Sequence, residues 1–225
     1  GHGDYRTPVL APESVQEVAD LTYDAFDLAD RYRTPVMVLG DGMLGQMKEP
    51  VIFPEKRTAL PEKEWALKGR GDGASRYMAS LILDALEMER HNWKLVRKYR
   101  EIQKNEVRYE AYMMDDAEIV AVAYGTTARI AKGAIKRVRK DGIKAGLIRP
   151  LTLWPFPTGI IQDLSQKIRS FVVFEMSTGQ MVDDVKMALE GRSRVYFHGR
   201  PGGIIPTPAE FARILYREYM LLKKG

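Results

Sequence analysis

Two short segments hold the side chains best suited to chemistry. His2 and Asp4 precede an apolar run, and a histidine there can shuttle a proton or pair with a carboxylate, although the pattern alone also fits a disordered terminus. Asp41 stands between Gly40 and Gly42 after a second apolar run. There it could hold a metal or the polar edge of a cofactor, or equally shape a turn through its own backbone. Neither segment supplies a nucleophile, a paired-carboxylate site or a metal cluster.

Two glycine-containing segments could bind ligands through their backbone. Gly125-Thr126-Thr127 lies between an apolar run and a helical pattern, where backbone N–H groups attract anions. It lacks both the GxGxxG spacing and the Walker lysine, and a tight strand-to-helix turn uses the same residues. The loop over residues 197–203 contains His198 and three glycines. Such a loop needs a defined conformation, either to dock another domain or to bind a ligand.

The first candidate residues flank a strand–helix–strand unit. Residues 9–12 and 35–39 have the length and apolar content of buried strands. Between them, Ser14 is a plausible N-cap with Glu17 at the capping-box position, and apolar residues then recur at spacings of three and four through Ala29. Strand, helix and strand in this order predict a parallel α/β unit.

A second sheet unit is predicted after a connector and a charged helical linker. Residues 53–76 contain prolines and glycines typical of irregular chain, and residues 76–114 have alternating charges typical of an exposed helix. Strands are then expected at 118–124, 145–148, 170–174 and 194–197, with helices at 128–140, at about 180–189 and from Pro208 onward. These patterns predict an α/β fold with an open, mostly parallel sheet, and domains at 1–52, 53–115 and 116–225.

Composition excludes several kinds of site. The 225 residues contain no cysteine, which excludes disulfides and cysteine-ligated iron–sulfur clusters within them, and three scattered histidines argue against structural zinc. No apolar run is long enough to cross a membrane, so we expect no membrane contact and a cytoplasmic location. The net charge of +5 leaves open a polyanion-binding patch, but the densest basic cluster has the spacing of a solvated helix face. Its members are Lys132, Lys136, Arg137, Arg139, Lys140 and Lys144.

The sequences of several segments resemble the α subunit of 2-oxoacid:ferredoxin oxidoreductases. Residues 1–17 and 33–47 are similar to the end of that family's pyrimidine-binding domain. Residues 124–129 and 148–157 are similar to its transketolase-C-terminal-like domain, and residues 199–208 resemble its closing segment. These stretches cover nearly the whole chain in family order. The branched-chain (2-oxoisovalerate) type is most similar, followed by the 2-oxoglutarate type.

The resemblance implies a reaction and its partners. The family decarboxylates a 2-oxoacid oxidatively on thiamine diphosphate, passes the acyl group to coenzyme A and gives the electrons to ferredoxin. Thiamine diphosphate, magnesium and the iron–sulfur clusters are then expected in the complete complex, with none bound to this chain alone. The implied partners are a thiamine-binding β subunit, a γ subunit and an iron–sulfur subunit, while a homodimer stays open and nucleic acid is not expected.

The resemblance also assigns expected roles to individual residues. His2 and Asp4 are expected near the thiazolium and the substrate, and Asp41 in a loop near the site and the partner interface. No nucleotide is expected at Gly125-Thr126-Thr127. The family's N-terminal part, with the glutamate that activates the aminopyrimidine ring, is absent from these residues, so we expect this chain alone to be inactive. The alternative is a self-standing α/β module that binds a nucleotide or RNA.

Overall fold

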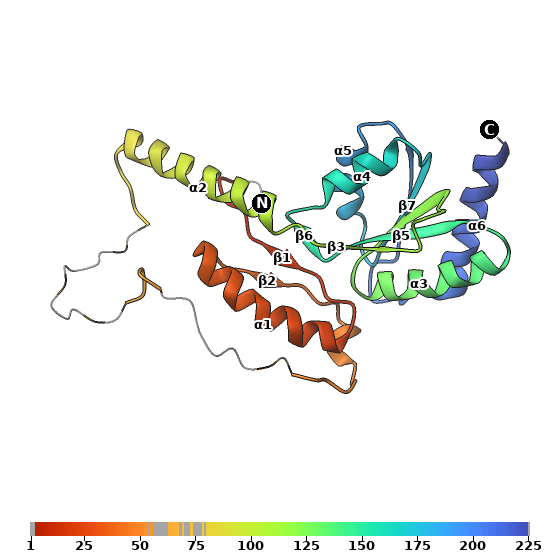
Figure 1. The fold of residues 1–225 in the computed structure, drawn as a ribbon, viewed down its shortest axis with the longest axis horizontal. Helices are drawn as coiled ribbons and strands as arrows, with labels where there is room; N and C mark the ends of the chain where they lie inside the picture. The colour runs from red at the N-terminus through yellow and green to blue at the C-terminus, as the bar shows by residue number, and fades with distance from the viewer. Residues whose placement is uncertain are drawn as a thin grey trace.

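The strands of the chain form two sheets. The structure is a computed structural model that describes residues 3–53, 55, 63–67, 69, 73, 78 and 80–224. The smaller sheet has the order β2-β1-β6, with β1 parallel to β2 and antiparallel to β6 (Figure 1). Its strands are β1 (Val9–Leu10), β2 (Met37–Val38) and β6 (Thr152–Trp154). The smaller sheet therefore takes one strand from the second half of the chain.

Helix α1 (Val15–Tyr32) packs on the smaller sheet. It begins as expected, because the Ser14 Oγ accepts a hydrogen bond from the Glu17 N–H at 3.1 Å. Leu21 and Leu28 lie on its buried face and pack with Leu10 of β1. The helix and its two flanking strands confirm the predicted strand–helix–strand unit.

The larger sheet has five strands in the order β3-β5-β4-β7-β8. All neighbours are parallel except β3 and β5, which are antiparallel. Its strands are β3 (Tyr109–Tyr112), β4 (Ile119–Val122), β5 (Ala145–Pro150), β7 (Ser170–Glu175) and β8 (Arg194–Gly199). This order confirms the expected open, mostly parallel sheet.

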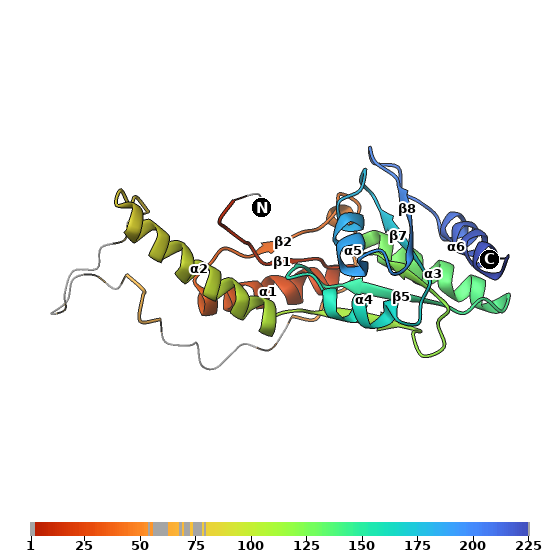
Figure 2. The same cartoon turned by 90° about the horizontal axis from the view of Figure 1, so that it is seen from above.

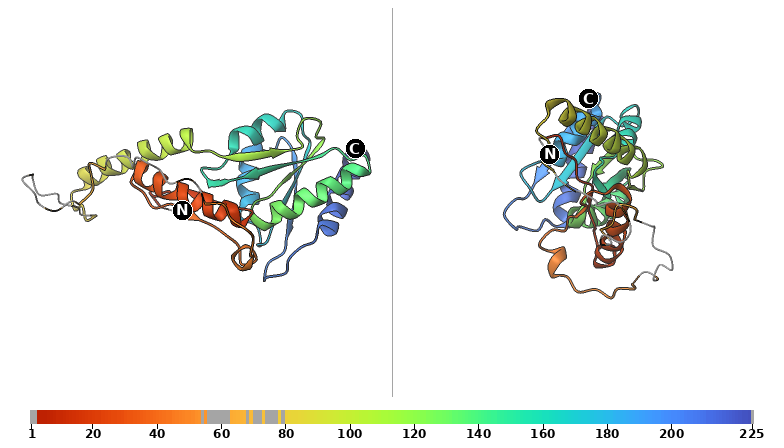
Figure 3. Two further views of the ribbon diagram at one scale, coloured as in Figure 1. Left: turned by 60° about the horizontal axis from the view of Figure 1, so that its bottom comes forward. Right: turned by 90° about the vertical axis from the view of Figure 1, so that its left-hand side faces the viewer.

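Helices cover both faces of the larger sheet (Figure 3). Side chains alternate along β4, so Ile119 and Ala121 pack under α3 and α6 while Val120 and Val122 face α4 and α5. The helices are α3 (Gly125–Lys140), α4 (Thr158–Ser165), α5 (Met181–Leu189) and α6 (Pro208–Lys224). The core of this unit is consequently closed on both sides.

Helix α2 (Ala85–Asn105) touches the body of the molecule mainly near its carboxyl end. Ile102 is its one fully buried residue and packs with the core under α1, whereas Leu86 and Trp93 are exposed. Figure 2 shows the amino-terminal part of α2 projecting away from the larger sheet. None of the described helices combines the length and the apolar composition that crossing a bilayer requires.

Some expectations need correction. The helix expected over residues 76–114 is wrong at residues 109–112, which form β3 by pairing with β5, with exposed and partly buried side chains alternating along the strand. The expected turn at Gly125-Thr126-Thr127 is the first turn of α3. Strand β6 and helix α4 were not expected. The connector over residues 53–76 lies largely outside the described residues, and the domain boundaries stay predictions.

Candidate functional site

The carboxylate of Asp41 joins two units, the smaller sheet with α1 and the larger sheet with its four helices. It follows β2 and accepts hydrogen bonds from the Thr126 N–H at 3.0 Å, the Thr126 Oγ1 at 2.9 Å and the Leu44 N–H at 2.9 Å. Gly125 has a φ of 57°, and a Cβ there would lie 3.1 Å from the Asp41 Oδ2. The half-buried carboxylate thus satisfies the N-terminus of α3 and shapes its own loop. A direct contact of Asp41 with substrate or cofactor stays a prediction.

A second carboxylate fills the N-terminus of α5. Glu175, at the end of β7, is 1% exposed. It accepts hydrogen bonds from the N–H groups of Met181 at 3.2 Å and Val182 at 2.9 Å, and from the Ser177 Oγ at 3.0 Å. At these two strand-to-helix junctions, an internal carboxylate occupies the position where a nucleotide-binding sheet holds phosphate. This arrangement argues against the alternative of a nucleotide-binding module.

A pocket of about 640 Å³ opens beside Asp41, between the two units. It lies where β2, β4, β7 and β8 end, which is the edge at which open α/β sheets bind ligands. Burial raises the pKa of Tyr124, and the nearby carboxylates of Glu175 and Asp41 raise it further, so its hydroxyl stays protonated at neutral pH. The lining residues are Asp41, Gly42, Met43, Gln46, Met47, Tyr124, Thr127, Met176, Gly203 and Ile205.

Asp4, the other candidate residue that the structure describes, does not line this pocket. Asp4 is exposed and precedes β1, whereas Asp41 follows β2. Because β1 and β2 are parallel, Asp4 and Asp41 lie toward opposite ends of the pair. His2 lies outside the described residues. The roles expected for His2 and Asp4 stay predictions.

The loop around His198 has a defined conformation. The His198 Nε2 lies 2.7 Å from the Glu210 Oε1 of α6, and its ring meets those of Phe174 and Phe211 edge-on. A Cβ on Gly199 would lie 2.4 Å from the Ser177 carbonyl oxygen, so only glycine fits there. The segment after Gly199 then reaches the pocket at Gly203 and Ile205.

Five charged side chains form a cluster between the units that sequence patterns did not indicate. Arg149 on β5 is 1% exposed and donates to both oxygens of Glu17, at 2.8 and 2.9 Å. It also pairs with Glu13 and Glu110, each at 3.1 Å. Lys132 pairs with the same two glutamates. The signal available in the sequence was a single arginine inside an apolar strand.

Ion pairing sets the protonation of this cluster. Burial raises the pKa of Glu17, but hydrogen bonds from Arg149 and from the Glu13 N–H outweigh it, so the net shift is downward. Burial lowers the pKa of Lys132, and its bonds to Glu110 and Glu13 reverse that effect. The solvated-face prediction for Lys132 is therefore wrong, because acids from the other unit and from β3 cover it.

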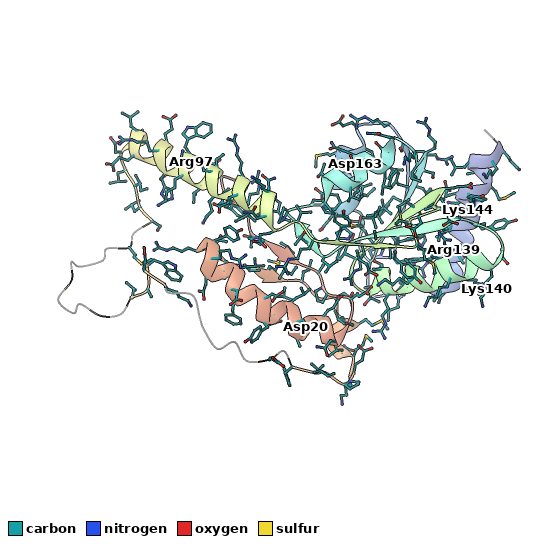
Figure 4. The ribbon with its side chains drawn as sticks, in the orientation of Figure 1. Asp20, Arg97, Arg139, Lys140, Lys144 and Asp163 are labelled. Atoms are coloured by element: carbon teal, nitrogen blue, oxygen red, sulfur yellow. The ribbon has the colours of Figure 1, made fainter. Side chains whose placement is uncertain are left out.

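The rest of the basic cluster is divided between paired and free side chains. Arg139 lies 2.7 Å from Asp116 and also donates to backbone carbonyls, whereas Lys136, Arg137 and Lys140 are exposed and have no ion pair within the described part of the chain. Figure 4 shows Arg139, Lys140 and Lys144 gathered near the carboxyl end of α3. For the exposed members, the solvated helix face agrees with the prediction.

Comparisons with known proteins identify the family. Residues 3–118 match the family model described as pyruvate flavodoxin/ferredoxin oxidoreductase, thiamine diP-binding, and residues 117–211 match pyruvate:ferredoxin oxidoreductase core domain II. The ketoisovalerate oxidoreductase subunit VorB of Methanothermobacter marburgensis is 50% identical over 204 residues, covering 90% of this chain and 58% of that protein. The 2-oxoglutarate synthase subunit KorA of Methanothermobacter thermautotrophicus is 30% identical, covering 96% and 65%. The chain thus spans less than two thirds of these relatives.

Two solved structures share the fold. The 2-oxoglutarate:ferredoxin oxidoreductase from Magnetococcus marinus, with 2-oxoglutarate, coenzyme A and succinyl-CoA bound, has a TM-score of 0.75 at 20% identity and covers 97% of this chain and 43% of that chain. A split-gene transketolase, an inactive β4 tetramer, has a TM-score of 0.52 at 12% identity, covering 96% and 57%. Both the expected family and the expected fold class are confirmed. Because the first family model alone matches more than half of its residues, this chain belongs to the pyruvate flavodoxin/ferredoxin oxidoreductase family, whose subunits the sequence resembles.

Proposed function

We propose that this chain is part of the α subunit of a branched-chain 2-oxoacid:ferredoxin oxidoreductase. The observation that carries the proposal is the 50% identity to a ketoisovalerate oxidoreductase subunit over 90% of the chain. Identity to 2-oxoglutarate synthase subunits is lower, at 30–34%. In the proposed reaction a 2-oxoacid is decarboxylated oxidatively, coenzyme A accepts the acyl group and ferredoxin accepts the electrons.

Coenzyme A as acceptor has separate support. The solved 2-oxoglutarate:ferredoxin oxidoreductase that shares this fold has coenzyme A and succinyl-CoA bound. By analogy, we propose coenzyme A as the acyl acceptor of the complete complex. Dependence of dye reduction on coenzyme A in the complete complex tests this part of the proposal.

The described residues do not fit the diphosphate end of thiamine diphosphate. The N-termini of α3 and α5 are filled by Asp41 and Glu175, no lysine or arginine lines the pocket among the described residues, and those residues contain no group of three metal-ligating side chains. We therefore propose that diphosphate and magnesium bind to another part of the complex. When bound, thiamine diphosphate supplies carbanion stabilisation, whereas these residues supply one side of the site.

Exposed apolar side chains support a multi-subunit assembly. Phe26 on α1 is 71% exposed, and Ile52 and Phe53 are at least 80% exposed. On α2, Leu86 and Trp93 are also exposed. Side chains of this size on neighbouring elements are typical of protein interfaces. We propose thiamine-binding β, γ and iron–sulfur subunits as partners, and the cytoplasmic location stays a prediction.

The test is reconstitution of the complete complex. The full-length subunit is co-expressed with its neighbouring subunits, and thiamine- and coenzyme-A-dependent reduction of a viologen dye is measured with aliphatic, aryl and dicarboxylic 2-oxoacids. We expect the highest kcat/KM with a branched aliphatic acid and no activity from the 225 residues alone. A complete complex that reduces the dye with none of these acids contradicts the proposal.

A further inference from the structure

The pocket between the two units is more apolar than polar, and no lysine or arginine is among its described lining residues. Met43, Met47, Met176 and Ile205 are among its lining residues, and thioether side chains adapt to ligands of different shape. Among its described lining residues, Asp41 is the sole charged one. A carboxylate or phosphate inside it would face a like charge without a compensating cation. The pocket chemistry therefore suits an uncharged, apolar group.

The polar side chains that line the pocket are either hydrogen-bonded within the chain or uncharged. The Asp41 carboxylate accepts bonds from Thr126 and Leu44, and the Thr127 Oγ1 donates to the Tyr124 carbonyl oxygen at 2.7 Å. Gln46 is exposed at the margin and carries no charge. A ligand therefore meets apolar side chains together with the neutral polar groups of Gln46 and Tyr124.

Position and size also favour a small-molecule site. The pocket lies at the carboxyl ends of parallel strands, and its volume of about 640 Å³ is within the usual range for small-molecule pockets. One wall is the loop held by Asp41, and the opposite wall is the segment that follows Gly199. The hydrogen bonds of Asp41 fix the first wall, and the Arg200 N–H, which donates to the Glu175 carbonyl oxygen at 3.0 Å, fixes the start of the second.

We propose that this pocket receives the side chain of the 2-oxoacid and selects branched aliphatic or aryl acids over dicarboxylic ones. This inference rests on the proposed function. The substrate's own carboxylate and keto group stay outside the pocket, toward the cofactor bound elsewhere in the complex. Selection against 2-oxoglutarate follows because its second carboxylate would enter an apolar space that holds Asp41 and no described cation.

The first experiment fills the pocket. Met43→Trp is made in the complete complex and compared with Met187→Trp, a control on α5 whose side chain is 69% exposed and does not line the pocket. We expect Met43→Trp to lower kcat/KM for 4-methyl-2-oxopentanoate and 3-methyl-2-oxobutanoate by about 10-fold or more, and for pyruvate by less than about 3-fold, since each excluded carbon group is worth about 10-fold or more. The control should leave the ratios unchanged.

The second experiment seeks a gain of function. Gln46→Arg places a cation at the pocket, and Gln166→Arg, exposed at the end of α4, adds the same charge elsewhere. We expect Gln46→Arg to raise kcat/KM for 2-oxoglutarate by about 10-fold, the usual gain from a charge-assisted hydrogen bond, and the control to leave it unchanged. A gain of activity cannot result from misfolding.

The outcomes separate the two proposals. Selective loss with Met43→Trp together with the gain from Gln46→Arg supports the pocket as a specificity site. An active complex in which Met43→Trp affects all acids equally, or in which Gln46→Arg gives no gain, overturns the inference and leaves the proposed function intact. An unmodified complex without activity on any 2-oxoacid overturns both.

Discussion

The larger sheet is covered by helices on both faces, whereas the smaller sheet depends on neighbouring elements for its completion. In the larger sheet, α3 and α6 cover one face and α4 and α5 the other. The smaller sheet has one helix of its own, α1, and borrows β6 from the second half of the chain. Exposed apolar residues such as Phe26 belong to this smaller unit. The larger sheet thus has both faces of its core closed by its own helices, whereas the smaller sheet needs a strand from the second half of the chain.

The largest expected effect comes from the core of the larger sheet. Phe211 on α6 is fully buried and stacks on Phe174 with ring centroids 3.8 Å apart. Phe211→Ala should lower the free energy of unfolding by about 3–5 kcal/mol. Urea titration followed by circular dichroism and tryptophan fluorescence should show both units unfolding together. A smaller sheet that stays folded after the larger one unfolds would show that it does not need this scaffold.

The second-largest loss of stability is expected from the charged cluster between the units. Arg149→Met leaves Glu13 and Glu110 paired with Lys132 alone and removes the ion pair of Glu17. We expect a loss of about 2–3 kcal/mol, reduced from the fully buried case because the glutamates are partly exposed. Urea titration against Arg137→Met, an exposed arginine without an ion pair in the described residues, isolates the effect. Equal losses in the two variants would contradict the role of the cluster.

Removal of the Asp41 carboxylate tests the second contact between the two units, the one at the start of α3. Asp41→Ala should cost about 1 kcal/mol, the usual value for losing a helix cap, while Asp41→Asn keeps an acceptor and should lose less. Amide hydrogen exchange at Thr126 should accelerate in the alanine variant. Protection at Thr126 that is the same in both variants would show that Asp41 does not hold the start of α3.

Lowering the pH should reduce the stability contributed by the charged cluster, by less than the preceding substitutions do. The pKa of Glu17 is lowered in the folded state, so its contribution to stability is present above the ordinary glutamate pKa and is lost as pH falls through the lower folded value. The effect is limited because the Glu17 side chain is 27% exposed. We expect the urea midpoint to fall between pH 6 and pH 3 by more in the unmodified chain than in Arg149→Met. Parallel curves would contradict this coupling.

The smallest effect on stability is expected at the exposed face of α1. Phe26→Ser should change the free energy of unfolding by no more than about 0.5 kcal/mol, because the ring is 71% exposed. The same variant should weaken co-purification of the partner subunits, whereas Met187→Ser on α5 should not. A loss of stability above 1 kcal/mol would show that Phe26 packs inside this chain.

Local patterns predicted the elements better than the contacts between them. The buried strands and α1 are each specified by neighbouring residues, such as Ser14 and Glu17 at a helix start. Strand β6 has only three residues and becomes a strand by pairing with β1, far away in the sequence. Unlike β1 and β2, it does not lie within a longer apolar run, so the local pattern did not indicate it.

Contacts between residues far apart in the sequence were also missed at the candidate site. Asp41 was found because a glycine-flanked aspartate after a strand is a local signal, but its partner Thr126 lies 85 residues away. Lys132 has the spacing of a solvent face, and acids contributed by other segments bury its charge. The pocket joins loops from four strands, so no single segment of sequence could indicate it.

The direct passage from β5 into β6 has a consequence for recombination and for limited proteolysis. A single residue, Leu151, separates a strand of the larger sheet from a strand of the smaller one. Cleavage between residues 53 and 84 would therefore not release the first unit, because β6 would stay paired with β1. A gene fragment ending near residue 118, where the first family model stops, would leave β1 without its antiparallel neighbour. The two units are thus not interchangeable modules. A gene segment exchanged between related proteins must encode both units if both sheets are to stay whole.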